Sequence, residues 1–235
     1  RLQALRTALQ ISGAYWELVR DIENLAASEQ SLVRAQKFYD TVRQHVERAL
    51  DVMEKRIIPG TTLAAYGNGD WNDSLQPVQP EMREHLCSSW TVTLNYQTLT
   101  TLSAALRKLG LNGRAEEFEK RAHNISRDFQ KILLVDDIIA GFAYFKRDSQ
   151  TEYLLHPRDQ QTGLSYSLLP MIHAIINDLL TAEQAAAHIG RLKQHLLGVD
   201  GARLFDRPFA YHGGPQRYFQ RAESSTFFGR EIGIM

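Results

Sequence analysis

Cysteine and net charge are the two things that this sequence has least of. A single cysteine, Cys87, stands among 235 residues, which excludes an intrachain disulfide and any metal site built from several thiolates. Basic and acidic side chains number 27 each, so the chain has no basic excess with which to collect the phosphates of nucleic acid or of a membrane surface. We therefore expect a cytoplasmic protein, in a reducing compartment, that binds neither nucleic acid nor membranes.

Long apolar runs and several common motifs are missing too. No run approaches the roughly 20 residues of a membrane-spanning helix, and no basic-then-apolar leader opens the chain. The sequence has no GxGxxG after a strand, no Walker loop and no HExxH zinc motif, and we expect neither a metal nor an organic cofactor. Because the chain starts at Arg1 and stops at Met235 inside an apolar, helix-like run, we expect a fragment truncated at both ends.

Helical periodicity dominates what is present. Residues 1–57 contain no proline and predict two helices, the second capped by Ser28. Residues 88–133 predict an antiparallel helix hairpin with a stop at Gly110 and a cap at Asn112. Apolar residues repeat on one face of each of its helices, namely Trp90, Leu94, Leu102, Ala105, Leu106 and Leu109 in the first and Ala115, Phe118, Ala122, Ile125, Phe129 and Ile132 in the second.

The composition changes after this hairpin. Residues 134–155 are rich in β-branched and aromatic side chains and predict a small β insert. Helices then resume, and Thr181 with Gln184 predicts a capping box. Helix hairpins with one small insert make a mostly α fold. We expect a single catalytic-type domain over residues 1–235, part of a toroid of helix hairpins whose long polar loops gather at one end as a site.

One of these loops, AYGNGDWNDSLQP at residues 65–77, combines turn residues with two acids and a tryptophan. Asp70, Asn72 and Ser74 match ligand positions of a calcium-binding loop. The glycine that such a loop requires is Leu75 here, which argues against calcium.

A tryptophan between two acids also suits the cleavage of glycosidic bonds. A protonated carboxyl must donate to the leaving oxygen, and a neighbouring aromatic ring offers a platform for the sugar and raises the carboxyl pKa by desolvation. Asp73 and Asp70 can serve as acid and sugar-hydroxyl acceptor, with Trp71 as the platform. The alternative is a plain turn, in which both acids make Asx-turns and Trp71 joins the core. Spacing alone does not decide between the two.

Two further clusters carry groups that bind anions or sugars. His156 and Arg158 of the HPRD run can contact an anion or a sugar hydroxyl, although spacing alone favours a helix-capping loop. Residues 211–231, YHGGPQRYFQRAESSTFFGRE, bring together arginines, hydroxyls and paired glycines, which are the groups that an oxyanion such as phosphate requires. The alternative for this run is a set of surface salt bridges to Glu223 and Glu231.

With these runs in view, the chain resembles the inverting glycoside phosphorylases of glycoside hydrolase family 94, the cellobiose phosphorylase-like enzymes. GNGDWNDSLQP is similar to the GDWND segment of that family. The later runs LLHPRDQQTGLSYSLLPM and DRPFAYHGGPQRYFQRAESSTFFGREIGIM resemble its branch of β-1,2-oligoglucan phosphorylases and cyclic β-1,2-glucan synthases. The likeness spans roughly residues 45–235. It implies an (α/α)6 toroid, of which this chain supplies about half, and a glycosyltransferase-type phosphorolysis of β-glucans to a sugar 1-phosphate.

The resemblance also implies substrates and residue roles. Partners would be an oligosaccharide or glucan and inorganic phosphate as co-substrate, and a homodimer is allowed. Asp73 matches the general acid and Trp71 a sugar contact. An Arg and an Asp that the family supplies from an earlier segment have no counterpart here. We expect substrate contacts from Asp70, Trp71, Asn72, His156, Arg158 and Glu223, and phosphate contacts from His212, Gln220, Thr226 and Arg230.

Two other functions remain open at this point. An inverting hydrolase on the same fold would use water instead of phosphate, with Glu223 as a base roughly 6.5–9.5 Å from the acid. A non-catalytic carbohydrate-binding or inactive fragment would bind sugar without turnover.

Overall fold

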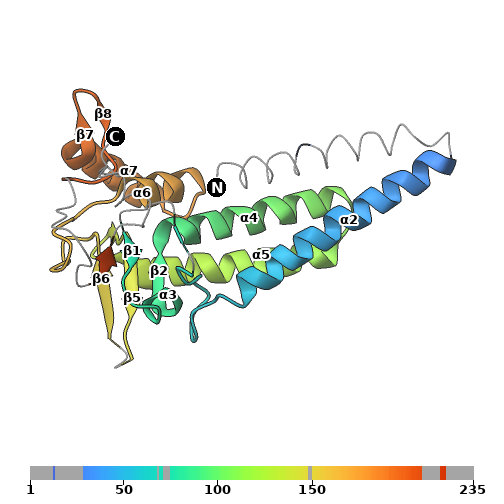
Figure 1. Cartoon of the computed structure of the whole chain (residues 1–235). Coiled ribbons are helices and arrows are strands. Elements are labelled where there is room, and N and C mark those ends of the chain that lie inside the picture. The colour runs from blue at the N-terminus through green and yellow to red at the C-terminus, as the bar shows by residue number, and fades with distance from the viewer. Residues whose placement is uncertain are drawn as a thin grey trace. The chain divides into compact units, whose positions relative to one another are not determined.

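The structure, a computed structural model, describes six stretches of the chain: Gly13 and residues 29–67, 69–70, 75–147, 150–207 and 218–220. These residues belong to two compact units, Arg1–Lys55 and Arg56–Met235. Helices predominate and the sheets are small, so the predicted mostly α fold is confirmed (Figure 1). The toroid and the single domain stay predictions. Within the described residues, no helix is long and apolar enough to cross a membrane.

The first unit is described mainly by helix α2 (Glu29–Glu54), which contains neither proline nor glycine. The predicted helix after Ser28 is therefore confirmed, and it ends before Pro59. The predicted first helix and the Ser28 cap lie outside the described residues, apart from Gly13, which is helical.

The second unit is built around the hairpin of α4 (Ser89–Lys108) and α5 (Asn112–Asp128), which confirms the predicted helix pair (Figure 1). Gly110 turns the chain between them at a φ of 73°, a left-handed conformation that glycine adopts at little cost. The predicted cap at Asn112 is wrong. The amide of Ala115 donates to the carbonyl of Leu111, so Leu111 holds the capping position, and its apolar side chain makes no capping hydrogen bond.

The two helices differ in how well the apolar pattern predicted burial. On α5 the predicted face is buried from Ala115 to Phe129, which confirms it. On α4 the predicted face is only half-buried, and the most buried stripe includes Val92, Leu99 and Ser103 instead. The reason is that α4 contacts several elements, namely α5, α6, β2 and η1, rather than one. Ser103 can lie against α5 because its hydroxyl donates to the carbonyl of Ala115 at 3.0 Å.

Three antiparallel strands lie at the end of the hairpin where α4 begins (Figure 1). They are β2 (Leu86–Ser88), β5 (Phe142–Phe145) and β6 (Thr151–Leu154), with β5 in the centre. Strands β5 and β6 confirm the predicted insert, whereas β2 lies outside that insert and was not predicted. A separate hairpin, β3 (Leu134–Val135) with β4 (Ile138–Ile139), follows the π-helical turn η1 (Phe129–Leu133) that extends α5.

The remaining elements are short. Thr181 and Gln184 make the predicted capping box at the start of α7, since each side chain accepts a hydrogen bond from the other residue's amide. The other bounds are α3 (Met82–His85), α6 (Leu168–Ile176), α7 (Ala182–Arg191), η2 (Leu192–Leu196), β1 (Gln76–Pro77), β7 (Leu197–Gly198), β8 (Gly201–Ala202) and β9 (Phe219–Gln220).

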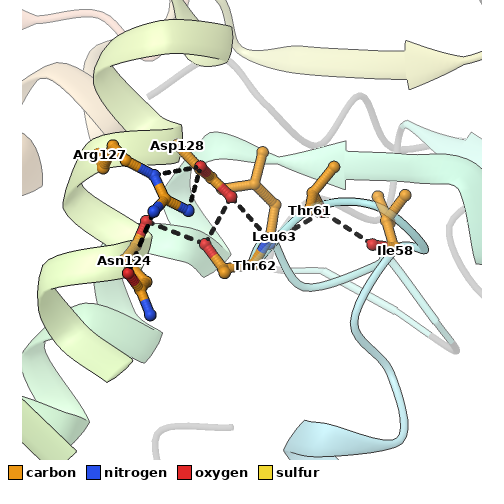
Figure 2. Close-up of polar contacts among 7 residues, drawn as sticks. All are labelled: Ile58, Thr61, Thr62, Leu63, Asn124, Arg127 and Asp128. Atoms are coloured by element: carbon orange, nitrogen blue, oxygen red, sulfur yellow. Dashed lines mark hydrogen bonds and ion pairs between the residues drawn. The ribbon is translucent and has the colours of Figure 1, made fainter. Parts of the chain in front are cut away.

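A carboxylate on α5 fixes the loop that leads into AYGNGDWNDSLQP. Asp128 Oδ2 accepts hydrogen bonds from both the amide and the hydroxyl of Thr62, each at 2.8 Å, as Figure 2 shows. The other oxygen, Oδ1, accepts from the guanidinium of Arg127 at 3.1 Å. Thr62 also donates its hydroxyl to the carbonyl of Asn124 at 3.0 Å. The end of α5 therefore holds the loop only a few residues before the run with the two acids.

A close approach at Gly141 yields a stability prediction. A Cβ at Gly141 would lie 2.6 Å from the Cβ of Leu155, a buried residue held at a φ of 53°. We expect Gly141→Ala to lower the free energy of unfolding by about 1–3 kcal/mol, because the clash cannot relax without moving backbone. Gly190 in α7 has no atom within 4 Å of such a Cβ, so Gly190→Ala should raise it by up to about 1 kcal/mol. Urea unfolding of both variants measures the two changes in the free energy of unfolding. Equal changes would contradict the view that Leu155 leaves no room for a side chain at Gly141.

Candidate functional site

The structure describes a minority of the predicted site residues. Asp70, His156 and Arg158 are described with their side chains, and Gln220 with its backbone in β9. Asp73, the predicted acid, lies outside the described residues, as do Trp71, Asn72, His212, Glu223, Thr226 and Arg230.

Asp70 is enclosed beside the first turn of α4, with only 4% of its surface exposed. Thr91 donates its hydroxyl to Asp70 Oδ1 at 3.4 Å. A carboxylate at this place is favoured by the positive end of the helix dipole. Burial raises the pKa of the Cys87 thiol, and the negative charge of Asp70 raises it further. Asp70 therefore holds the start of the DWND run against α4, and its predicted sugar contact stays a prediction.

The residues just before Asp70 run along strand β2. Tyr66 donates its amide to the carbonyl of Leu86 at 2.6 Å, and Gly67 donates to the carbonyl of Arg83 at 2.8 Å. Gly67 lies at a φ of 63°, where a Cβ would come within 3.2 Å of the Arg56 side chain. Backbone hydrogen bonds thus fix the chain as far as Gly67, three residues before the DWND run begins.

The residues just after the DWND run pair with the predicted phosphate segment. Strand β1 pairs antiparallel with β9, with Gln76 opposite Gln220. Val78 adds a hydrogen bond from its amide to the carbonyl of Tyr218 at 2.9 Å. In sequence, Asp73 is three residues before Gln76, and the predicted phosphate ligands surround β9. Two runs that are far apart in the sequence are therefore neighbours at these strands.

His156 is placed at the centre of its loop and is 1% exposed. Its Nδ1 accepts from the amide of Arg158 at 3.1 Å, and Nε2 lies 3.1 Å from the carbonyl of Val135, to which it can donate. Both ring nitrogens thus contact the backbone, so the residue stabilises the loop. Substrate binding by His156 stays a prediction that requires one of these contacts to be exchanged.

Arg158 and Asp159 take different roles in the same loop. Arg158 is exposed and pairs with Asp136 of the β3–β4 turn at 2.6 Å. Asp159 accepts from the amides of Leu155 at 2.7 Å and Gln161 at 2.6 Å. The loop does not cap a helix, because α6 begins only at Leu168. Arg158 is the residue of the run whose charged group faces solvent, which is compatible with its predicted contact to substrate.

A small pocket lies where these segments meet. Leu75, which follows the DWND run, lines it together with Ser88 and Trp90 at the start of α4 and with Ser167 and Phe205. The indole Nε1 of Trp90 is buried and has no hydrogen-bond partner among the described residues. In the part of the chain that the structure describes, no three His, Cys, Asp or Glu side chains are grouped to hold a metal ion.

Sequence reasoning missed one cluster of this region. Glu152 on β6 accepts a hydrogen bond from Tyr218 Oη at 2.6 Å and one from Gln161 Nε2 at 3.0 Å, and it pairs with Lys146 at 2.6 Å. These four residues are isolated polar positions in the sequence with no common spacing. Only the fold brings them together, so no motif could have indicated them.

Two buried histidines make the free energy of unfolding depend on pH. Burial lowers the pKa of His156 and of His188, whose Nε2 accepts from the amide of Ile139. Below about pH 6.5 the unfolded chain binds protons that the folded chain does not, so stability is full above that pH and falls as the pH drops. His188→Gln should reduce this slope by up to about 1.4 kcal/mol per pH unit. Urea unfolding from pH 7.5 to 5.5 measures how the free energy of unfolding changes with pH. His123→Gln, at an exposed position, is the control. Equal slopes for the two variants would contradict the prediction.

Comparison with known proteins shows that this chain is similar to a glycoside phosphorylase. The relative is a 1,2-β-oligoglucan phosphorylase from Listeria innocua serovar 6a, 36% identical over 231 residues. The match covers 96% of this chain but 21% of the relative, so the chain spans about a fifth of that protein's length. No family model matches the chain. The predicted likeness to glycoside phosphorylases is confirmed at this level, and membership of family 94 stays a prediction.

Proposed function

We propose that the protein carrying this chain cleaves β-linked glucans by inverting phosphorolysis and releases a sugar 1-phosphate. Asp73 acts as the general acid, and inorganic phosphate is the nucleophile. The likeness to a 1,2-β-oligoglucan phosphorylase supports a β-1,2-linked glucan as the substrate. Within this proposal, the chain forms part of an (α/α)6 toroid of family 94 and acts in the cytoplasm, with a homodimer allowed.

The pairing of β1 with β9 carries this proposal. Phosphorolysis requires an acid on one side of the glycosidic bond and a bound anion on the other. The run with the acid continues directly into β1, and the run rich in arginines and hydroxyls contains β9. Backbone pairing between them supports a single site to which both contribute. A sequence likeness alone would leave the two runs unconnected.

The chemistry follows from the two groups. Asp73 donates its proton to the glycosidic oxygen as the bond to the anomeric carbon breaks, and the shortened glucan leaves with that proton. An oxygen of phosphate attacks the anomeric carbon from the opposite face, which inverts its configuration. Phosphate is itself the nucleophile, so the reaction needs no second carboxylate to activate water. His212, Gln220, Thr226 and Arg230 supply the donors and charge that hold the phosphate.

Six further residues take supporting roles in the proposal. Trp71 is the platform for the sugar, Asn72 binds a sugar hydroxyl, and Asp70 holds the run against α4 from its enclosed position. Arg158 contributes a charged group at the rim from the HPRD loop. His156 keeps that loop in shape, and Glu223 contacts the substrate.

The experiment measures product as a function of phosphate concentration. The full-length protein is incubated with β-1,2-linked glucan oligosaccharides, and sugar 1-phosphate and free sugar are quantified separately. The proposal requires sugar 1-phosphate that rises with phosphate and no turnover without it. Free sugar at a phosphate-independent rate would replace the proposal with a hydrolase that uses Glu223 as its base. Oligosaccharide binding without either product would indicate a binding protein.

A further inference from the structure

The pair of strands that joins the phosphate segment to the acid segment, β1 and β9, is very short. β1 and β9 have two residues each, and so short a ladder is weak on its own. Phe219 helps, because it is buried and its ring lies 5.5 Å from that of Phe142. What else fixes β9 therefore decides where the phosphate segment lies relative to the acid.

Tyr218, the residue before β9, is held by a carboxylate from the separate three-stranded sheet. Its hydroxyl donates to Glu152 Oε2 at 2.6 Å, and its ring meets Tyr144 edge-on with centroids 5.6 Å apart. Lys146 Nζ contacts the same oxygen at 2.6 Å, and Gln161 from the HPRDQQTG loop donates to Oε1 at 3.0 Å. One carboxylate thus joins β6, the end of β5, the HPRD loop and the phosphate segment.

The Glu152 carboxylate is partly enclosed, with 20% of its side chain exposed. Burial pushes the pKa of Glu152 upward, but the hydrogen bonds from Lys146 and Tyr218 outweigh burial, and the pKa is lowered overall. The group is therefore charged at neutral pH, and its hydrogen bond to Tyr218 is of the stronger, charge-assisted kind.

We propose that Glu152 is a positioning residue for phosphate: through Tyr218 it holds β9 against β1 and so fixes the phosphate-binding segment relative to the acid. Glu152 touches neither phosphate nor glucan. Its positioning role rests on the proposed function, because that function assigns phosphate binding to the segment around β9. Loss of the contact weakens the binding of phosphate selectively, since the acid and the sugar platform lie on the other run.

The test compares Glu152→Gln and Tyr218→Phe in the full-length protein, with Tyr153→Phe on the same strand as Glu152 as the matched control. We expect each test variant to raise KM for phosphate by about five- to twentyfold, while KM for the glucan changes less than about twofold. The double variant should be no worse than the more impaired single one, because both changes remove the same contact between Tyr218 and Glu152. Tyr153→Phe should behave like the unaltered protein.

Several outcomes would overturn the inference. Equal increases in both KM values, or a lower melting temperature with unchanged kinetics, would make Glu152 a purely structural residue. Additive effects in the double variant would show that Glu152 does not act through Tyr218. If Glu152→Gln does not fold, Tyr218→Phe alone decides, and an unchanged KM for phosphate refutes the role. An unaltered protein without phosphate-dependent turnover refutes the proposed function instead, so the two failures are distinguishable.

Discussion

Replacing Asp73 by asparagine is expected to lower kcat for phosphorolysis by roughly 10²- to 10⁴-fold, the usual contribution of general acid catalysis. Asparagine keeps the size of the side chain and its turn propensity but carries no acidic proton for the leaving oxygen. The fold and the binding of glucan should therefore change little. Initial rates of sugar 1-phosphate release by the full-length protein, at saturating phosphate and glucan, measure the effect.

A substrate with an acidic leaving group separates loss of the proton from loss of structure. The nitrophenolate of a nitrophenyl β-glucoside leaves without protonation, so the rate deficit of Asp73→Asn should shrink on that substrate. Asp51→Asn, at an exposed position of α2, is the matched control and should keep the unaltered rate. Near-normal release of sugar 1-phosphate by Asp73→Asn would show that another group is the acid.

Replacing Asp128 by alanine is expected to lower the free energy of unfolding by about 2–4 kcal/mol. Asp128 is 7% exposed, and Thr62 donates two hydrogen bonds to it, from its amide and its hydroxyl. Alanine would leave the half-enclosed amide of Thr62 without its acceptor, whereas the hydroxyl would keep the carbonyl of Asn124. Desolvation of the unpaired amide is the larger part of the cost. Urea unfolding monitored by circular dichroism gives the change.

The control for Asp128 is an exposed acid in an ion pair on the same helix. Glu117 pairs with Arg114 at 2.5 Å, with the two side chains 46% and 37% exposed. Because solvent screens such pairs, Glu117→Ala should cost at most about 0.5 kcal/mol. Equal destabilisation by the two variants would contradict the view that burial and the Thr62 contacts give Asp128 its importance.

Local signals in the sequence predicted local structure well. The Thr181–Gln184 box and the apolar repeat of α5 depend on residues within a turn or two of each other, and both were confirmed. The cap at Asn112 failed by one residue because Gly110 lets the helix start earlier, at a leucine. The apolar repeat of α4 failed because that helix contacts several other elements, and a single-face pattern assumes one.

The sequence did not predict the pairing of strands that are far apart along the chain. Strands β1, β2 and β9 were not predicted, because strands of two or three residues are too short to show an alternating pattern. Their pairing depends on partners far along the chain. The same holds for Glu152, which has no motif around it. The segments that carry the candidate site were predictable from their residue types, whereas their meeting at β1 and β9 was not.

The configuration of the product tests the central claim most directly, because direct attack by phosphate on a protonated β-glucoside allows one outcome. Full-length protein, β-1,2-linked glucan and phosphate are mixed, and the first sugar 1-phosphate formed is observed by ¹H and ³¹P nuclear magnetic resonance. The proposed mechanism predicts the α-anomer from the start, in an amount that follows the phosphate added. A β-anomer would require a covalent intermediate on the protein, and free sugar alone would require water as the nucleophile. Either result would contradict phosphorolysis by Asp73 and phosphate in a single displacement.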